Sequence, residues 1–180
     1  MLNVGVLRSK RAPGLEALRE RTNVVCVLER HAPRRSERES FDAETAAMFR
    51  RFDVDAVVCL GYLYVITEPL LAAFPDRILN VHDSDLPHYP GLHATRDAIY
   101  AGERETRSSV HIVTPQLDAG PVLARSEAFP VAPFVLEAVA RGEHDIVRAY
   151  AYAQREWMMR STWGALAADA LERLALEAVA

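Results

Sequence analysis

Short apolar runs alternate with helix-compatible stretches in this chain, and that alternation restricts the fold more than any other feature of the sequence. Two valine- and leucine-rich runs at residues 3–7 and 24–28 flank a stretch typical of a helix at residues 14–21. A second expected helix at residues 41–52 precedes a continuous apolar run at residues 55–61, which is typical of a strand covered on both faces. The pattern predicts an α/β fold with a mostly parallel sheet and helices on both faces.

The same alternation continues and then gives way to a helical C-terminal region. The pattern predicts helices at residues 69–73 and 92–101, and strands at residues 77–82, 108–114 and 121–131. From about residue 134 to residue 178 it is helical, with an interruption near Gly142. Within this region one apolar stripe is expected, formed by Ile146, Tyr150, Ala153 and Trp157.

Length and composition favour a single globular domain over residues 1–180. Half of the residues are hydrophobic and 26% are charged, as in ordinary globular proteins. The longest stretch without Asp, Glu, Lys or Arg, residues 56–67, is shorter than the ~18 apolar residues of a membrane span. We therefore expect no membrane association. The N-terminus lacks the pattern of a secretory signal, so we expect a cytoplasmic protein whose Cys26 and Cys59 are free thiols.

Charge is distributed unevenly along the chain. The first 40 residues carry 9 basic and 5 acidic side chains, whereas residues 41–180 carry 12 basic and 20 acidic side chains. An acidic body argues against a nucleic-acid partner, because such binding requires side chains that neutralise phosphates. The basic front can hold one small anion. No cluster has the spacing of a metal site, and we expect none.

Polar side chains interrupt an apolar strand at the edge where ligands collect in α/β proteins. Asn80 and His82 are two residues apart, so they share one face of the strand. A loop rich in turn-forming residues follows at residues 83–91, and functional residues are often on such loops. A carboxylate at Asp118 can fix the tautomer of a nearby imidazole. His82 and Asp118 also have structural interpretations, as a satisfied strand-end histidine and as part of an ordinary tight turn.

Three separated motifs resemble those of the folate-dependent formyltransferases, most closely the glycinamide ribonucleotide formyltransferases. The resemblance extends from about residue 55 to residue 131, and the motifs occur in the order and at the intervals of that family. They are Ile-Leu-Asn-Val-His at residues 78–82 with the loop that follows to His93, Ser-Val-His-Ile-Val-Thr at residues 109–114, and Leu-Asp-Ala-Gly-Pro-Val at residues 117–122.

The resemblance implies a three-layer, Rossmann-like fold and a chemical activity. The activity is transfer of a formyl group from 10-formyltetrahydrofolate to a small-molecule primary amine such as phosphoribosylglycinamide, a step of purine biosynthesis. Asn80, His82 and Asp118 match the catalytic residues of the family. Attack of the amine on the formyl carbon creates an oxyanion, which N–H groups of Asn80 and His82 would stabilise. Asp118 would orient His82 and help to remove the proton from the attacking nitrogen.

The resemblance also implies where the donor and the acceptor bind. The positions that match the donor site are Leu63, Tyr64, Val65, Ile66, Asn80, Thr114, Gln116, Leu117 and Asp118. Those expected to hold the acceptor are Arg8, Ser9, Lys10 and Gly91. The family's glycine-rich phosphate loop is replaced by residues 8–14, where Pro13 withholds one amide. Asp85 replaces a residue that is usually apolar. These departures leave the identity of the acceptor open.

Several alternatives remain at this point. A sugar-nucleotide N-formyltransferase, a formyltetrahydrofolate hydrolase and a non-catalytic folate-binding protein would all retain the same motifs. Methionyl-tRNA formyltransferase is disfavoured because its RNA-binding domain has no counterpart in 180 residues, and a dehydrogenase because no Gly-x-Gly-x-x-Gly follows the first strand. We expect His111 to be structural, residues 157–163 to be core or interface, and the C-terminal helices to form a possible homodimer contact.

Overall fold

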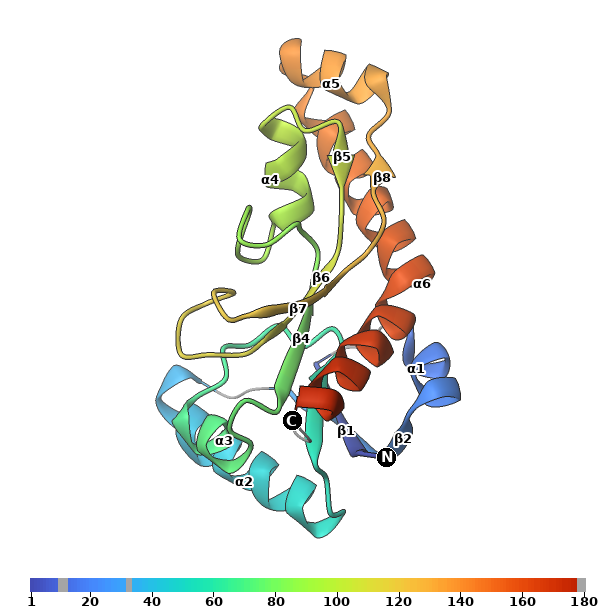
Figure 1. The fold of residues 1–180 in the computed structure, drawn as a ribbon. Coiled ribbons are helices and arrows are strands. Elements are labelled where there is room, and N and C mark those ends of the chain that lie inside the picture. The colour runs from blue at the N-terminus through green and yellow to red at the C-terminus, as the bar shows by residue number, and fades with distance from the viewer. Residues whose placement is uncertain (10–12, 32–33, 178–180) are drawn as a thin grey trace.

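The computed structural model describes residues 1–9, 13–31 and 34–177. A six-stranded sheet lies at its centre (Figure 1). The first four strands in the sheet order are parallel, and the fifth pairs antiparallel with the strands on both sides of it. In the order of the sheet, the strands are β2 (Asn23–Glu29), β1 (Asn3–Arg8), β3 (Ala56–Cys59), β4 (Ile78–His82), β6 (Ser109–Ile112) and β7 (Val122–Arg125). The predicted α/β class and mostly parallel sheet are confirmed.

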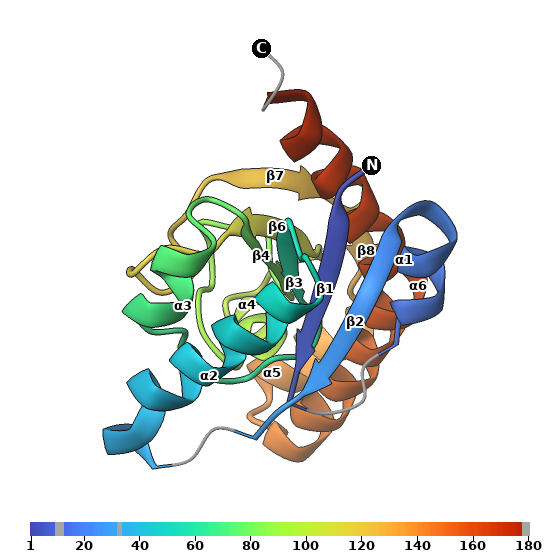
Figure 2. The ribbon, with the colours of Figure 1, turned by 90° about the horizontal axis from the view of Figure 1, so that it is seen from below.

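Helices cover both faces of the sheet (Figure 2). On one face lie α1 (Leu15–Arg21) and α6 (His144–Glu177), and on the other lie α2 (Arg38–Arg51) and α3 (Glu68–Ala73). Consecutive residues of a strand point to opposite faces, so Val6 packs in the cluster that contains Trp163 of α6, whereas Leu7 packs in the cluster that contains Phe49 of α2. The apolar runs of the strands are continuous because each face meets a helix layer.

Helix α1 lies against α6 at a contact that only glycine permits. A Cβ atom added to Gly164 would be 2.1 Å from the carbonyl oxygen of Gly14, and real Cβ atoms do not approach other atoms so closely. Gly14 itself has a φ of 97°, a left-handed conformation that favours glycine. The two backbones therefore touch directly at the start of α1.

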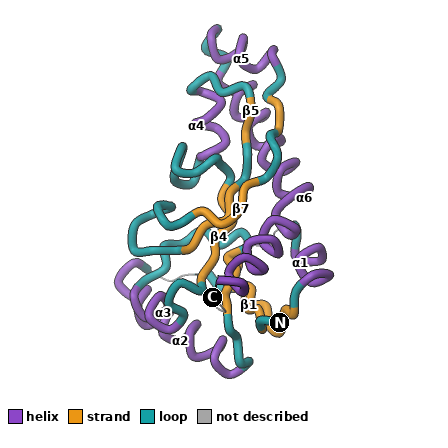
Figure 3. The backbone as a smooth tube through the Cα atoms, viewed as in Figure 1, coloured by secondary structure: helices purple, strands orange, loops and turns teal. Residues whose placement is uncertain are grey.

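Helix α6 extends from the region beside the preceding helix, residues 133–140, to the sheet (Figure 3). The face of α6 that is buried differs from the expected one. The expected stripe faces solvent in large part, because Ile146 is 44% and Trp157 is 49% exposed. The buried residues of this part of the helix lie one position further along, at Val147, Ala151, Gln154 and Met158. Both sets have the same helical spacing. The set that begins with Val147 and Ala151 packs against α5 (Pro133–Ala140) and α4 (Ala94–Tyr100).

The single strand expected at residues 121–131 is in fact two strands. Strand β7 ends at Arg125, and β8 (Phe129–Pro130) pairs with β5 (Glu105–Thr106) in a separate two-stranded sheet. After β7 the Ser126 amide still donates to the Ser108 carbonyl oxygen, but the Ser108 amide donates to the Ser126 hydroxyl instead of to a backbone carbonyl. A short 3-10 helix, η1 (Arg35–Glu37), precedes α2. Among the described residues, no helix has the length and hydropathy to cross a membrane.

Candidate active site

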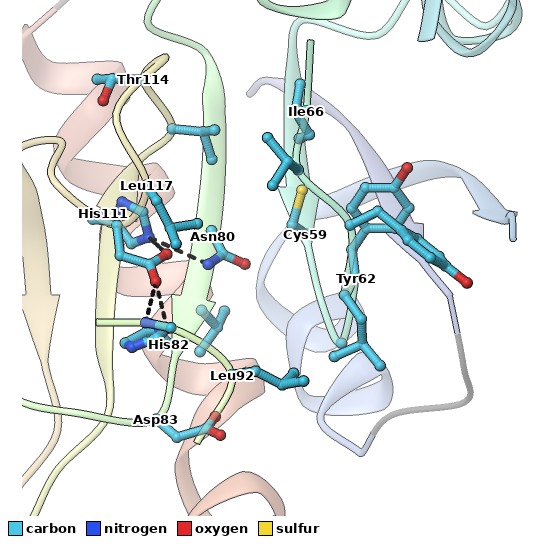
Figure 4. A pocket seen from close by; sticks show the side chains of 18 of the residues that line it. Cys59, Tyr62, Ile66, Asn80, His82, Asp83, Leu92, His111, Thr114 and Leu117 are labelled. Carbon is cyan, nitrogen blue, oxygen red and sulfur yellow. Dashed lines mark hydrogen bonds and ion pairs between the residues drawn. The ribbon is translucent and has the colours of Figure 1, made fainter. Parts of the chain in front are cut away.

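A cavity of about 250 Å³ lies at the carboxyl ends of β3 and β4 (Figure 4). Segments far apart in the sequence form its walls, because β4 places its polar residues beside β6 and the turn that follows β6. The lining includes side chains that can exchange protons or bind polar groups of a ligand, namely Asn80, His82, Asp83, His111, Thr114, Asp118 and Arg155. The remaining lining is largely apolar and aromatic, as in small-molecule sites.

Asn80 is oriented by a histidine on the neighbouring strand. In the β4–β6 register Asn80 lies opposite His111, and the Asn80 Nδ2 atom is 3.2 Å from His111 Nε2. The Nδ1 atom of His111 is 2.9 Å from the Ile112 carbonyl oxygen, so Nδ1–H donates to that oxygen and Nε2 accepts from the amide. Burial lowers the pKa of His111, which favours this neutral form. One N–H of Asn80 is thereby fixed, and its second N–H is left for a ligand.

Asp118 joins the two imidazoles of the cavity. Its Oδ2 atom accepts a hydrogen bond from the Gly91 amide at 2.7 Å. The same Oδ2 atom lies 3.7 Å from His82 Nδ1, and Oδ1 lies 3.6 Å from His111 Nε2. The Asp118 side chain is only 9% exposed. Asp118 has a φ of 50°, a left-handed conformation that aspartate tolerates better than most residues. The turn therefore holds a carboxylate against both rings.

His82 has a fixed ring orientation. Its Nε2 atom lies 3.2 Å from the carbonyl oxygen of Tyr89, to which Nε2–H donates, and Nδ1 faces Asp118. The hydroxyl of Ser84 donates to the carbonyl oxygens of His88 and Tyr89 at 2.7 and 3.1 Å, which holds the loop that carries Tyr89. A protonated His82 would thus have an acceptor on each side of its ring.

The structure brings the expected catalytic residues together with most of the expected donor positions. Asn80, His82 and Asp118 all line the cavity, as do Leu63, Tyr64, Val65, Ile66, Thr114 and Leu117. Gln116 is not among the lining residues. In the described part of the chain, the backbone amides of residues 64–66 donate to no partner, and these residues line the cavity beside Tyr62.

The expected acceptor positions are only partly brought to the cavity. Gly91 lines it. Arg8 and Ser9 do not: the Arg8 guanidinium pairs with Glu29 at 3.0 Å, and the Ser9 hydroxyl donates to the Gly61 carbonyl and accepts the Leu63 amide, each at 3.1 Å. Lys10 is outside the described residues. In this region the described side chains brace neighbouring segments instead of facing the cavity.

Sequence reasoning missed three polar contributors to the site. His111 was expected to be structural, although its place opposite Asn80 is a consequence of the antiparallel register between β4 and β6. Asp83 and Arg155 form an ion pair in the lining although 72 positions separate them. No local pattern signals a contact between a loop and a distant helix, so the ion pair of Asp83 and Arg155 could not have been found from spacing.

The arrangement combines hydrogen-bond donors with groups that accept and release protons. A free amide N–H at Asn80 and an imidazole at His82 can stabilise negative charge that develops on a carbonyl oxygen. The Asp118 carboxylate beside them can accept a proton, directly or through water. In the part of the chain that the structure describes, no three His, Cys, Asp or Glu side chains are grouped so that they could hold a metal ion. The geometry supports attack of a nucleophile on a carbonyl carbon.

Comparisons with known proteins point to one family. The sequence pattern of the formyl transferase family matches residues 3–141. The phosphoribosylglycinamide formyltransferase of Escherichia coli strain K12 is 38% identical over 90 residues, which cover 50% of this chain and 42% of that protein. The trifunctional purine biosynthetic protein adenosine-3 of Drosophila melanogaster is 35% identical over 98 residues, which cover 54% of this chain and 7% of that protein. The matched region thus spans less than half of each relative's length.

Solved structures extend the similarity over most of the chain. Glycinamide ribonucleotide transformylase 1 from Symbiobacterium toebii superposes with a TM-score of 0.64 and 28% identity, covering 88% of this chain and 86% of that chain. Phosphoribosylglycinamide formyltransferase from Anaplasma phagocytophilum superposes with a TM-score of 0.71 and 25% identity, covering 95% of this chain and 87% of that chain.

Proposed function

The chain belongs to the formyl transferase family, and from this premise we propose that it transfers a formyl group from 10-formyltetrahydrofolate to a small-molecule primary amine. The observation that carries the proposal is the convergence of Asn80, His82 and Asp118 in one cavity. Phosphoribosylglycinamide is the first acceptor to test, because the relatives with the matching region are named for that substrate. The reaction would then be a step of purine biosynthesis.

The donor side of the cavity suits a flat heterocycle with polar edges. The walls are the segment at residues 63–66 and the turn at residues 114–117. Free backbone amides at residues 64–66 can bind the edge of a pterin with few demands on side-chain identity. Apolar side chains such as Val113 and Ile66 can contact its faces.

The proposed reaction begins when the amine nitrogen of the acceptor attacks the formyl carbon. A carbon–nitrogen bond forms, and the carbonyl electrons move to the oxygen. The second N–H of Asn80 and the Nδ1–H of protonated His82 would stabilise the oxyanion. The Nε2–H of His82 is engaged by the Tyr89 carbonyl oxygen, whereas Nδ1 is 3.7 Å from Asp118 Oδ2, which is longer than a hydrogen bond. Asp118 would take the proton from the attacking nitrogen, directly or through water. When the oxyanion collapses, the bond between the formyl carbon and the donor nitrogen breaks. That nitrogen would receive the proton held by Asp118, directly or through water, to give tetrahydrofolate and the N-formyl product.

One plate assay separates the proposal from its alternatives. Purified protein is mixed with 10-formyltetrahydrofolate, and the release of tetrahydrofolate is followed with glycinamide ribonucleotide, with an amino-sugar nucleotide and without any amine. We expect release that depends on glycinamide ribonucleotide. Release only with the amino-sugar nucleotide would change the acceptor, and equal release without amine would indicate hydrolysis. Donor binding without release in any well would indicate a non-catalytic folate-binding protein and would overturn the proposal.

A further inference from the structure

Asp83 and Arg155 form an ion pair at one end of the cavity. Asp83 follows His82 directly, and Figure 4 shows Asp83 and Thr114 on opposite sides of His82. The Arg155 Nε atom donates to Asp83 Oδ2. The two side chains are only 18% and 10% exposed, and both line the cavity. The pair therefore belongs to the lining of the cavity and is directly next to His82.

Two contacts fix the guanidinium of Arg155. Its Nε–H group is engaged by Asp83, and its central carbon lies 5.5 Å from the centroid of the Trp163 ring, within the range of a cation–π interaction. Trp163 is itself held, because its Nε1–H donates to the Ser108 hydroxyl at 3.2 Å. Within the described residues, the terminal nitrogens Nη1 and Nη2 of Arg155 make no hydrogen bond. Those two nitrogens form the fork that matches a carboxylate or a phosphate.

Arg155 is also distinctive in the charge of the cavity. Among the described lining residues it is the one Arg or Lys side chain. Arg8, which follows the first strand, is paired with Glu29 and does not line the cavity. Burying an ion pair offers little stability compared with apolar packing. An orientated guanidinium that lines the cavity and has donors without partners among the described residues is better suited to binding a ligand than to stabilising the fold.

We propose that Arg155 binds an anionic group of the acceptor, a carboxylate or a phosphate, while the amine of the same acceptor lies beside His82. Asp83 acts as a positioning residue, because it directs the Nη1–Nη2 edge of the guanidinium. This inference rests on the proposed function, and it narrows the acceptor to amines that carry a negative charge. Arg155 would supply the anion contact that the described part of the loop after β1 does not offer.

Binding of matched ligand pairs to the wild-type protein tests the inference without catalysis. One pair is glycinamide ribonucleotide and its dephosphorylated riboside, and the other is glycine and glycinamide. Calorimetry in the absence of donor gives each dissociation constant. We expect the anionic member of at least one pair to bind about tenfold to hundredfold more tightly, as for a charge-assisted hydrogen bond. The pair that shows the preference identifies phosphate or carboxylate as the anion. Equal affinities in both pairs would overturn the inference.

Variants assign the preference to Arg155. Arg155→Gln should abolish it, Arg155→Lys should retain part of it, and Arg160→Gln should leave it intact. Arg160 lies on the same helix, is 71% exposed and does not line the cavity, so it is a matched control for the loss of charge. Asp83→Asn separates a binding role from a merely structural pair. The asparagine keeps an oxygen that can accept the Arg155 Nε–H group and removes a negative charge, so this variant should keep or strengthen anion binding. A merely structural pair would make Asp83→Asn and Arg155→Gln equally harmful.

The outcomes also separate this inference from the proposed function. Turnover of amines by the wild type with an anion preference that persists in Arg155→Gln would overturn the inference and retain the function. Anion binding that depends on Arg155, without formyl transfer to any amine, would overturn the function instead. Thermal melts show whether each variant is folded. If Arg155→Gln is not folded, the same ligand pairs are measured with Arg155→Lys, for which the inference predicts a reduced preference for the anionic ligand. A preference that is unchanged in Arg155→Lys and lost in Asp83→Asn would contradict the inference.

Discussion

Two strand ends at the same edge of the sheet are used in opposite ways. At the end of β4, His82 and its neighbour Asn80 project into the cavity and form a network with Asp118 and His111. At the end of β1, Arg8 is neutralised by Glu29, and the polar groups of Ser9 are consumed by neighbouring segments. The carboxyl edge of an α/β sheet is the usual place for ligands. The comparison shows that the partners of each side chain decide whether a strand end serves chemistry or packing.

The largest effect should come from removing a polar group at the end of β4. Asn80→Ala and Asp118→Asn should each lower kcat by about 10² to 10³, the typical cost of losing one oxyanion donor or one acid–base group. Asparagine tolerates the left-handed backbone at position 118, so the fold should be retained. Steady-state kinetics with the acceptor found in the plate assay gives kcat, and circular dichroism checks the fold. Full turnover by a folded variant would remove that residue from the mechanism.

The start of α1 should respond in stability and not in chemistry. In Gly164→Ala the new Cβ atom would overlap the carbonyl oxygen of Gly14, and we expect a loss of about 1–3 kcal/mol in the free energy of unfolding. Alanine has the higher helix propensity, so an increase in stability would show that the two backbones do not touch. Denaturant titration measures the change. Ser161→Ala, at an exposed position of the same helix, is the control and should change little.

His111 should make the stability of the fold depend on pH. Burial lowers its pKa, so the unfolded chain, with an ordinary histidine pKa near 6.5, takes up the proton first as the pH falls. The stability that neutral His111 contributes is present above about pH 6.5 and is lost as the pH falls towards its folded-state pKa. The difference in unfolding free energy between the wild type and His111→Asn should therefore shrink from pH 7.5 to pH 5.5. A difference that grows over this range would show that His111 is protonated in the fold.

The wall at residues 63–66, on the donor side of the cavity, should be the least sensitive region. If backbone amides read the pterin edge, Tyr64→Leu should raise the KM for the donor by less than about tenfold, the size of one aromatic contact, and leave kcat unchanged. Tyr62→Phe keeps the neighbouring ring, which lies 5.5 Å from that of Tyr64, and is the control. A hundredfold rise in Tyr64→Leu alone would assign recognition to the side chain.

Local sequence patterns predicted much of the fold because strands and helices differ in period. The continuous apolar runs located β1, β2, β3 and β4 closely, and the motif around Asn80 located the cavity. The buried face of α6 was misplaced by one position, from Ile146 to Val147, because two stripes of equal spacing run side by side. Only packing against α4 and α5 decides between them.

The remaining errors concern contacts between distant segments. His111 joins the site through strand register, and Arg155 through the path of a long helix past the loop after β4. Arg8 has the charge expected of an anion site, but its guanidinium forms an ion pair with Glu29 on the adjacent strand. In each case the sequence specifies the side chain correctly, while tertiary structure determines which group it contacts.

The most direct test of the account follows the formyl carbon itself. 10-Formyltetrahydrofolate labelled with ¹³C in the formyl group is mixed with the protein and glycinamide ribonucleotide, and the label is followed by NMR in the wild type and in Asn80→Ala. The account predicts that the signal moves to the N-formyl group of the acceptor in the wild type and remains on the donor over the same period in the variant. Transfer at the same rate in both proteins, or a label that stays on the donor in the wild type with every amine tested, would contradict it.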